Sequence, residues 1–305
     1  MKRRWVVTGA CGQLGAYLMQ TLADSGNQAE QVVGMGRRRC TRHGDVVRAS
    51  LSEATRPGGL LDALRPTHLI HLAGVTSPTR AEADHQTAWE LNVAVTSRLA
   101  RWSADNGAWF AFTSSDVVWG GQSGRRWRED DVPAPRSHYA RTKVAAEREV
   151  ATLGGAIIRL SLMYGLPLCP RQTTWTRVMT AFASNTPVPA CIDEYRTPIT
   201  FADAAEAIVG LGRQQYRGVV HVAGPEIVTP YELFAGLATA HGWVARLRPI
   251  RRAELPGGLD RPANMAVDAT RLRVLLPGFT VAPPPPGNRA DVEPHALTDR
   301  ALPLS

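Results

Sequence analysis

The sequence has little cysteine, no long apolar run and fewer acidic than basic residues. Its four cysteines show no C-x-x-C spacing and no nearby histidine pair, so neither a metal site nor a disulfide framework is predicted. No run approaches the roughly 18 apolar residues of a membrane-spanning helix. The apolar stretch in MKRRWVVTGACGQLG ends after three residues, too early for a signal peptide. We therefore expect a cytoplasmic protein with no membrane partner.

The charge balance favours small anionic ligands over nucleic acid. Lys+Arg 35 against Asp+Glu 27 gives a net charge of +8, but many arginines are scattered singly instead of forming one stripe. We therefore expect no nucleic-acid partner. The hydrophobic share of 44% and the length of 305 residues allow one large domain, alone or with a smaller one.

Short apolar runs alternate with helical segments in the first half of the chain. RWVVTG, AEQVVGMG, THLIHLAG and AWFAFTSS are typical of strands buried on both faces, and stretches such as GQLGAYLMQTLADSG and AWELNVAVTSRLARWSADNG are typical of helices. This order predicts an α/β protein with a doubly wound parallel sheet.

A glycine-rich turn directly follows the first expected strand and opens the first expected helix. VVTGACGQLG places Gly9, Gly12 and Gly15 at three-residue intervals. The first glycine allows a tight turn, the second allows close approach of a pyrophosphate, and the third allows the helix to pack on the strand. A simple turn is the alternative, but the strand and helix around it favour dinucleotide binding. The same loop adds the expected cofactor contacts Cys11, Gln13 and Leu14.

The residues after the second expected strand favour NADP over NAD. This strand ends in VVGMGRRRCTRHG, with no acidic residue before Asp45 to bind the ribose hydroxyls of NAD. Arginine accommodates the additional phosphate of NADP, so we expect NADPH to be preferred over NADH, with Arg37 first and Arg38 second as ligands. The alternative is a solvated basic loop.

The glycine loop predicts a Rossmann-type doubly wound parallel sheet with a smaller, discontinuous C-terminal substrate domain. We predict an NAD(P)-binding domain over 1–164, to which 199–222 returns. The Pro-interrupted stretches give a substrate-binding part over 165–198 and 223–282, and the Pro-rich 283–305 is expected to be a mobile tail.

Eight motifs follow one another over most of the chain: TGACGQLG, HLAGVT, LNVAVTSRLA, TSSDVVWGG, YARTKVAAE, IIRLSLMYG, TPITFADAAEAI and RPANMAVDATRL. In these motifs and their order the chain resembles the extended short-chain dehydrogenase/reductase family, and within it the reductases of nucleotide-activated 4-keto-6-deoxy sugars, the dTDP-4-dehydrorhamnose reductase group. The resemblance implies an oxidoreductase that acts on a nucleotide sugar. Dimers are frequent in the family, which leaves a homodimer open.

The resemblance implies a catalytic group made of Ser115, Tyr139 and Lys143. Tyr139 matches the proton donor to the alkoxide that forms when hydride reaches the carbonyl carbon. A phenol with a pKa near 10 needs a nearby positive charge for this role. Lys143 lies four residues further along a helix, on the same face, and matches the lysine that also holds the nicotinamide ribose. Ser115 matches the group that hydrogen-bonds the substrate carbonyl.

Further cofactor contacts follow from the same resemblance. Ala73 and Gly74 match a strand end that lies along the cofactor. Asn92 matches an asparagine that supports the lysine through a water molecule, although a buried capping or packing role is the alternative.

The substrate contacts implied are Ser115, Asp116, Trp175 and Arg196, with Arg261 as a weaker candidate. Arg196 is expected to bind the substrate diphosphate, for which bidentate guanidinium geometry is suited. Ser115, Asp116 and Val117 stand where the family's 4,6-dehydratases have Thr, Asp and Glu. The missing glutamate argues against dehydration.

Three functions fit these residues. The first is an NADPH-dependent reductase of a nucleotide-linked 4-keto-6-deoxy sugar in deoxysugar biosynthesis. The second is an NAD-dependent epimerase or another ketoreductase, because a fold does not fix its chemistry. The third is a non-catalytic NADP-binding regulatory subunit, since one relative in this branch, the regulatory subunit of methionine adenosyltransferase, is a binding partner. The intact Ser115, Tyr139 and Lys143 argue against the third.

Overall fold

A parallel seven-stranded sheet forms the centre of the part of the chain that the structure describes. The computed structural model describes residues 2–36, 45–120, 124–170, 173–255 and 261–287. The strand order β10-β6-β5-β4-β1-β2-β3 reverses direction around β1, and every neighbouring pair is parallel. The expected doubly wound α/β fold is therefore confirmed. The strands are β1 (Arg3–Thr8), β2 (Glu30–Gly36), β3 (Val46–Arg48), β4 (His68–His71), β5 (Trp109–Ser115), β6 (Ala156–Leu160) and β10 (Gly218–Val222).

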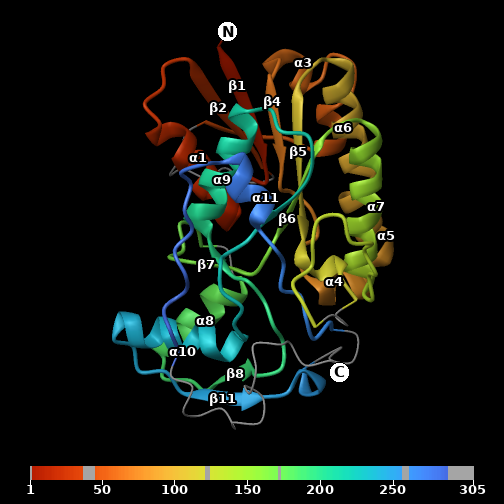
Figure 1. The fold of residues 1–305 in the computed structure, drawn as a ribbon. Helices are drawn as coiled ribbons and strands as arrows, with labels where there is room; N and C mark the ends of the chain where they lie inside the picture. Colours follow the sequence, from red (N-terminus) through yellow and green to blue (C-terminus); the bar gives the residue numbers. More distant parts are fainter. Residues whose placement is uncertain (1, 37–44, 121–123, 171–172, 256–260, 288–305) are drawn as a thin grey trace.

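Helices cover both faces of this sheet (Figure 1). One face carries α1 (Gln13–Asp24), α9 (Phe201–Arg213) and α11 (Thr270–Leu275), and the other carries α6 (Val95–Asp105) and α7 (His138–Thr152). The short helices α2 (Leu51–Ala54) and α3 (Leu60–Leu64) lie on the side of α6. Successive side chains of a strand point to opposite faces of the sheet. In β1, Trp5 and Val7 pack with α1 and α9, whereas Val6 packs with α6 and α7. Burial on both faces explains why the strands lack polar alternation.

The expected helix over AWELNVAVTSRLARWSADNG contains a wider turn. Helix α4 (Pro78–Ala83) is followed by α5 (His85–Trp89), a single π-helical stretch η1 (Glu90–Ala94), and then α6. The stretch η1 contacts α7 and contains the buried Asn92. Such π-bulges are frequent at functional sites, and the local sequence carried no signal for this one.

The segments after β6 build a smaller layer below the sheet in Figure 1. It contains α8 (Thr174–Ala183), α10 (Pro230–His241) and the parallel pair β8 (Val188–Cys191) and β11 (Leu247–Ile250), which a short 3-10 turn η3 (Arg252–Glu254) follows. A second parallel pair, β7 (Met163–Tyr164) and β9 (Ile199–Thr200), joins this layer to α9.

Three elements that follow β6 lie with the large sheet: β10, α9 and α11. Strand β10 pairs with β6, and α11 packs against β10. Helix α9 begins after Thr200, whose Oγ1 accepts a hydrogen bond from the Asp203 backbone N–H at 3.0 Å, so Thr200 is the N-cap. The predicted domain boundaries stay a prediction, and residues 288–305 of the predicted tail lie outside the described part of the chain. No helix within that part is long and apolar enough to cross a membrane.

We expect Gly212→Ala to destabilise the protein. A Cβ at this position of α9 would lie 2.6 Å from Trp5 Cη2 and 2.9 Å from Trp109 Cζ3, and both rings are buried. The steric clash should outweigh the better helix propensity of alanine, so the free energy of unfolding measured in urea should fall by ~1 kcal/mol or more. Gly210→Ala is the matched control, because its Cβ would meet only the flexible tip of Leu276 at 3.1 Å. Equal effects of the two variants would contradict this explanation.

We expect the unfolding free energy to fall as the pH drops from about 6.5 to about 5. Burial lowers the pKa of His71 and of His221 to about 3, helped by the charges of Lys143 and Arg159 respectively. The unfolded chain binds these protons near pH 6.5, so acid favours unfolding, by about 2 kcal/mol per histidine at pH 5. Urea unfolding across this window measures the loss. Ordinary carboxyl groups have not yet titrated there, so a constant free energy would contradict the assignment.

Candidate functional site

The glycine loop and the strand ends meet at one edge of the sheet. Gly9 follows β1 and has φ +71°, a conformation that favours glycine. A Cβ on Gly9 would lie 3.0 Å from the backbone nitrogen of Ala73, which follows β4. The neighbouring β5 ends in Ser115. The carboxyl ends of parallel strands at a reversal of strand order form the usual ligand crevice of such folds.

The loop geometry fits the pyrophosphate of a dinucleotide. Gly12 is the N-cap of α1; it has extended backbone angles and, being glycine, offers no side chain as a cap. Its backbone N–H donates to Gly9 O at 2.8 Å, which closes the turn. A Cβ on Gly15 would lie 2.7 Å from Ala10 Cα, so the third glycine is needed for packing of the helix against the turn. The dipole at the N-terminus of a helix favours negative charge at this place.

Helix α1 also holds the segment that follows β7. Gln13 Nε2 donates to Cys169 O at 2.8 Å and its Oε1 accepts from the Leu168 N–H at 3.0 Å. Tyr17, one turn further, donates its hydroxyl to Leu166 O at 2.7 Å. Gln13 is 3% exposed, and its side chain, together with that of Tyr17, holds residues 166–169 against α1. The neighbouring expected cofactor contacts differ in burial: Leu14 is buried in the core and Cys11 is half-buried.

Tyr139 and Lys143 lie on the buried face of α7. The helix begins after Ser137, whose Oγ accepts from the Ala140 N–H at 3.2 Å. Lys143 Nζ donates to the Thr113 carbonyl oxygen of β5 at 3.0 Å, and it lies 5.9 Å from the centre of the Tyr139 ring. The side chain of Ser115 lies close enough to Tyr139 to lower its pKa. The structure thus brings together all three residues that the family resemblance implied.

Burial dominates the electrostatics of these groups. It lowers the pKa of Lys143 to about 8, while the negative charge of Glu147 acts in the opposite direction. Burial raises the pKa of Tyr139 above its usual range, and the charge of Asp116 raises it further. The nearby Ser115 side chain lowers it. Tyr139 is therefore a neutral phenol, able to donate a proton, beside a lysine that is largely protonated at neutral pH.

Asn92 has a complete set of protein partners. Its Oδ1 accepts from the Val75 N–H at 2.8 Å, and its Nδ2 donates to Val75 O at 3.1 Å and to Thr142 Oγ1 at 3.0 Å. A Cβ on Gly74 would lie 2.5 Å from Asn92 Oδ1, so glycine is needed there. Asn92 thus ties the end of β4 to the residue beside Lys143, an arrangement that fits the buried structural alternative.

A buried group of charges adjoins Ser115. Asp116, in the 3-10 turn η2 (Asp116–Val118), is 1% exposed and accepts from Ser161 Oγ at 3.0 Å. Arg196 Nη1 contacts both Asp116 oxygens at 3.2 Å, and its Nε donates to Glu194 at 2.9 Å. Arg261 also pairs with Glu194. Glu194 was missed from the sequence, since its second partner, Arg261, lies 67 residues further along the chain.

A second buried pair supports the helix that carries Lys143. Glu147 lies one turn beyond Lys143 and binds Arg159 of β6 with both oxygens, at 3.0 Å from Nε and 2.7 Å from Nη2. The Arg159 guanidinium lies 4.7 Å from the centre of the Trp119 ring. Glu147 was not predicted as functional, although the spacing of Tyr139, Lys143 and Glu147 at four-residue intervals places all three on one helix face.

Three predicted residues lie elsewhere or cannot be placed. Trp175 is 4% exposed and packs between α8 and α10 against Tyr164, Phe234 and Trp243. Arg37 and Arg38 lie outside the described residues. Within the described part of the chain, no group of three or more His, Cys, Asp and Glu could hold a metal ion.

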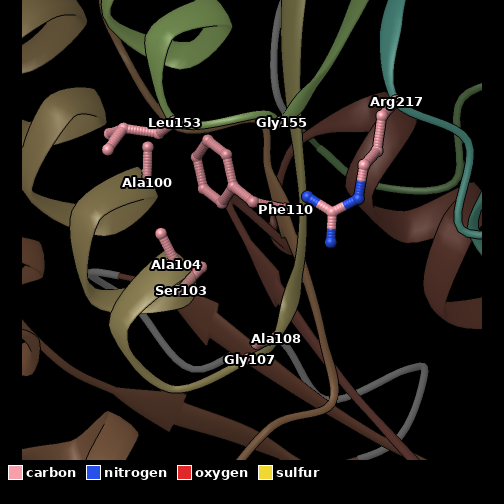
Figure 2. A pocket seen from close by; sticks show the side chains of 9 residues that line it. All are labelled: Ala100, Ser103, Ala104, Gly107, Ala108, Phe110, Leu153, Gly155 and Arg217. Carbon is pink, nitrogen blue, oxygen red and sulfur yellow. The ribbon is translucent and has the colours of Figure 1, made fainter.

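A cavity of about 150 Å³ lies at the opposite end of the sheet (Figure 2). It is bounded by the C-terminal end of α6 and by the residues that precede β5 and β6, among them Ala108 and Gly155. Because the glycine loop and Ser115 lie at the carboxyl ends of the strands, this cavity is not part of the reactive site.

The fold and site define a class of dinucleotide-fold protein, the short-chain dehydrogenases/reductases: a doubly wound parallel sheet, a glycine loop before the first helix, and a half-buried Ser beside a buried Tyr and Lys. Within it, the model of the RmlD substrate binding domain matches residues 3–280. The chain therefore belongs to the RmlD substrate-binding domain family of NAD(P)-dependent reductases, and the family resemblance found in the sequence is confirmed.

Two relatives with similar sequence identity to this chain are named as different kinds of protein. The chain is 31% identical over 287 residues to the dTDP-4-keto-6-deoxy-D-glucose reductase of Streptomyces niveus, covering 91% of this chain and 93% of that protein. It is 30% identical over 283 residues to methionine adenosyltransferase 2 subunit beta of Rattus norvegicus, covering 90% and 82%.

A solved structure agrees with the fold. The dTDP-4-dehydrorhamnose reductase of Bacillus anthracis, in complex with NADP, superposes with a TM-score of 0.80 at 23% identity, covering 93% of this chain and 96% of that one. At this level of identity the likeness shows the fold alone.

We expect Glu147→Gln to destabilise the protein strongly. Loss of the carboxylate leaves the Arg159 charge buried without its partner, which costs about 3–5 kcal/mol in comparable pairs. Glu149→Gln on the same helix is the matched control, because its hydrogen bond to Ser97 is exposed and its loss should cost less than about 1 kcal/mol. Urea unfolding of both variants measures the difference. Similar losses would show that the Arg159 pair does not hold α7 in place.

Proposed function

We propose that the protein is an NADPH-dependent reductase of a nucleotide-activated 4-keto-6-deoxy sugar. The observation that carries the proposal is the contact of Tyr139 with Ser115 beside Lys143, at the sheet edge where the glycine loop lies. The name of the Streptomyces niveus relative supports this choice of substrate. The proposed nucleotide sugar carries two phosphate charges, which agrees with the basic composition.

Each side chain has a distinct task in the proposed reaction. Bound NADPH supplies hydride to the carbonyl carbon of the substrate. Ser115 donates a hydrogen bond that orients the carbonyl oxygen and stabilises its developing negative charge. Tyr139 transfers its phenolic proton to that oxygen, and the positive charge of Lys143 stabilises the phenolate left behind.

The preference for NADPH rests on the sequence after β2. Arg37 and Arg38 follow the strand directly, and Asp45 is the first acidic residue after it. Gly9, Gly12 and Gly15 supply the cradle for the pyrophosphate. The other expected contacts, Ala73, Gly74 and Asn92, lie at the neighbouring end of β4 or against it.

Two alternatives differ from this proposal in measurable ways. An epimerase would keep its nicotinamide and recycle it, whereas a reductase consumes added NADPH in stoichiometric amounts. A regulatory subunit would bind NADPH without oxidising it, and the relatives named methionine adenosyltransferase 2 subunit beta favour testing this. The complete Ser115, Tyr139 and Lys143 group supports the reductase.

We expect NADPH oxidation with at least one member of a panel of dTDP-, CDP-, GDP- and UDP-linked 4-keto-6-deoxy sugars, followed by absorbance of the reduced cofactor. Tyr139→Phe should lower the rate about 100-fold or more, since it removes the proton donor. Tyr216→Phe is the matched control, because that residue precedes β10, at the end of the sheet opposite the glycine loop, and its hydroxyl donates to Val219 O at 2.8 Å. Protein that binds NADPH but never oxidises it with any sugar of the panel would overturn the proposal.

A further inference from the structure

Asp116 and Arg196 join the reactive strand end to the smaller layer. Asp116 follows β5, and Arg196 lies in the segment between β8 and β9, 80 residues further along the chain. The backbone of Arg196 exchanges two hydrogen bonds with Val228, at 3.0 and 2.9 Å, which fixes it before α10. Arg196 therefore belongs structurally to the smaller layer, while its guanidinium lies at the reactive site.

The guanidinium of Arg196 is already bound on each nitrogen. Nη1 contacts both oxygens of Asp116, Nε donates to Glu194, and Nη2 lies 3.1 Å from Met265 Sδ. Arg261 provides the second positive charge at Glu194, so two carboxylates face two guanidiniums. A substrate diphosphate would have to displace buried carboxylates to reach Arg196. The contacts therefore argue against the phosphate-binding role expected from the sequence.

The same contacts place opposite charges around Tyr139. The carboxylate of Asp116 opposes formation of a phenolate there, and the guanidinium of Arg196 favours it. Ser115 lies between these groups: its hydroxyl donates to Asp116 Oδ1 at 3.2 Å, and its side chain lowers the pKa of Tyr139. Without Arg196, Tyr139 would face the Asp116 charge alone in a buried site, where such charges are weakly screened.

We propose that Arg196 is a positioning residue: it neutralises and orients Asp116, so that Ser115 and Tyr139 can perform proton transfer. Its catalytic meaning rests on the proposed function, but its effect on Tyr139 is a property of the protein without substrate. Because the backbone of Arg196 is held in the smaller layer, the proposal also means that the smaller layer influences proton transfer by Tyr139.

Other charged groups near Tyr139 act from different sides. Lys143 lies on its own helix, and Glu194 acts through Arg196. Glu82 and His85, on α4 and α5, are exposed and contact His138 at the start of α7. None of these groups contacts Asp116 among the described residues, so variants of Arg196 and Asp116 isolate the proposed effect.

The test is a titration of residue 139 without substrate. A fluorinated tyrosine, which has a more acidic phenol, is placed at position 139, and its ionisation is followed by fluorine NMR. We expect Arg196→Gln to raise the midpoint by about 1 pH unit or more and Asp116→Asn to lower it by a similar amount. The double variant should return close to the parent, and Arg196→Lys should fall between the parent and Arg196→Gln.

A purely structural role gives a different pattern. An unchanged or lowered midpoint in Arg196→Gln, or shifts of both single variants in one direction, would overturn the proposal. Circular dichroism identifies a variant that does not fold; in that case Asp116→Asn and Arg196→Lys decide, and an unchanged midpoint in both rejects the proposal. Failure of every sugar in the NADPH assay would leave the titration valid, so the two proposals fail independently.

Discussion

The packing of α7 against strands β5 and β6 is the interaction on which the reactive site depends. Lys143 donates to the Thr113 carbonyl oxygen of β5, and Glu147 holds Arg159 of β6 with both oxygens. These contacts fix the rotation of the helix, so that Tyr139 faces Ser115. Both strands have neighbours on each side in the sheet, and the buried position of these contacts makes the helix orientation costly to change.

Desolvation is the largest influence on the pKa of each reactive group, and paired charges adjust it. Burial destabilises the charged forms of both Tyr139 and Lys143, while Glu147 favours the charged lysine. Asp116 and Arg196 act on Tyr139 with opposite sign. The site therefore holds a neutral proton donor beside a positive charge, and few groups control this balance because water is excluded.

The family membership fixes the fold more firmly than the activity. Relatives of nearly equal identity are named as a sugar nucleotide reductase and as a subunit of methionine adenosyltransferase. One fold supports several functions because activity depends on the side chains at the strand ends. Ser115, Tyr139 and Lys143 are all present in this chain. The loops that would contact a substrate depend instead on particular tertiary contacts, such as the hydrogen bonds of Gln13 with Leu168 and Cys169.

Local patterns in the sequence predicted the strands, the glycine turn and the helix that carries Tyr139 and Lys143. Apolar runs, glycine spacing and four-residue intervals express short-range geometry, which a sequence displays directly. Tertiary structure alone decided three contacts: Arg196 pairs with Asp116, Gln13 hydrogen-bonds Cys169, and Trp175 of α8 packs in the core against α10. Each of those contacts joins segments distant in sequence, and a buried polar group takes the partner that the assembled fold presents.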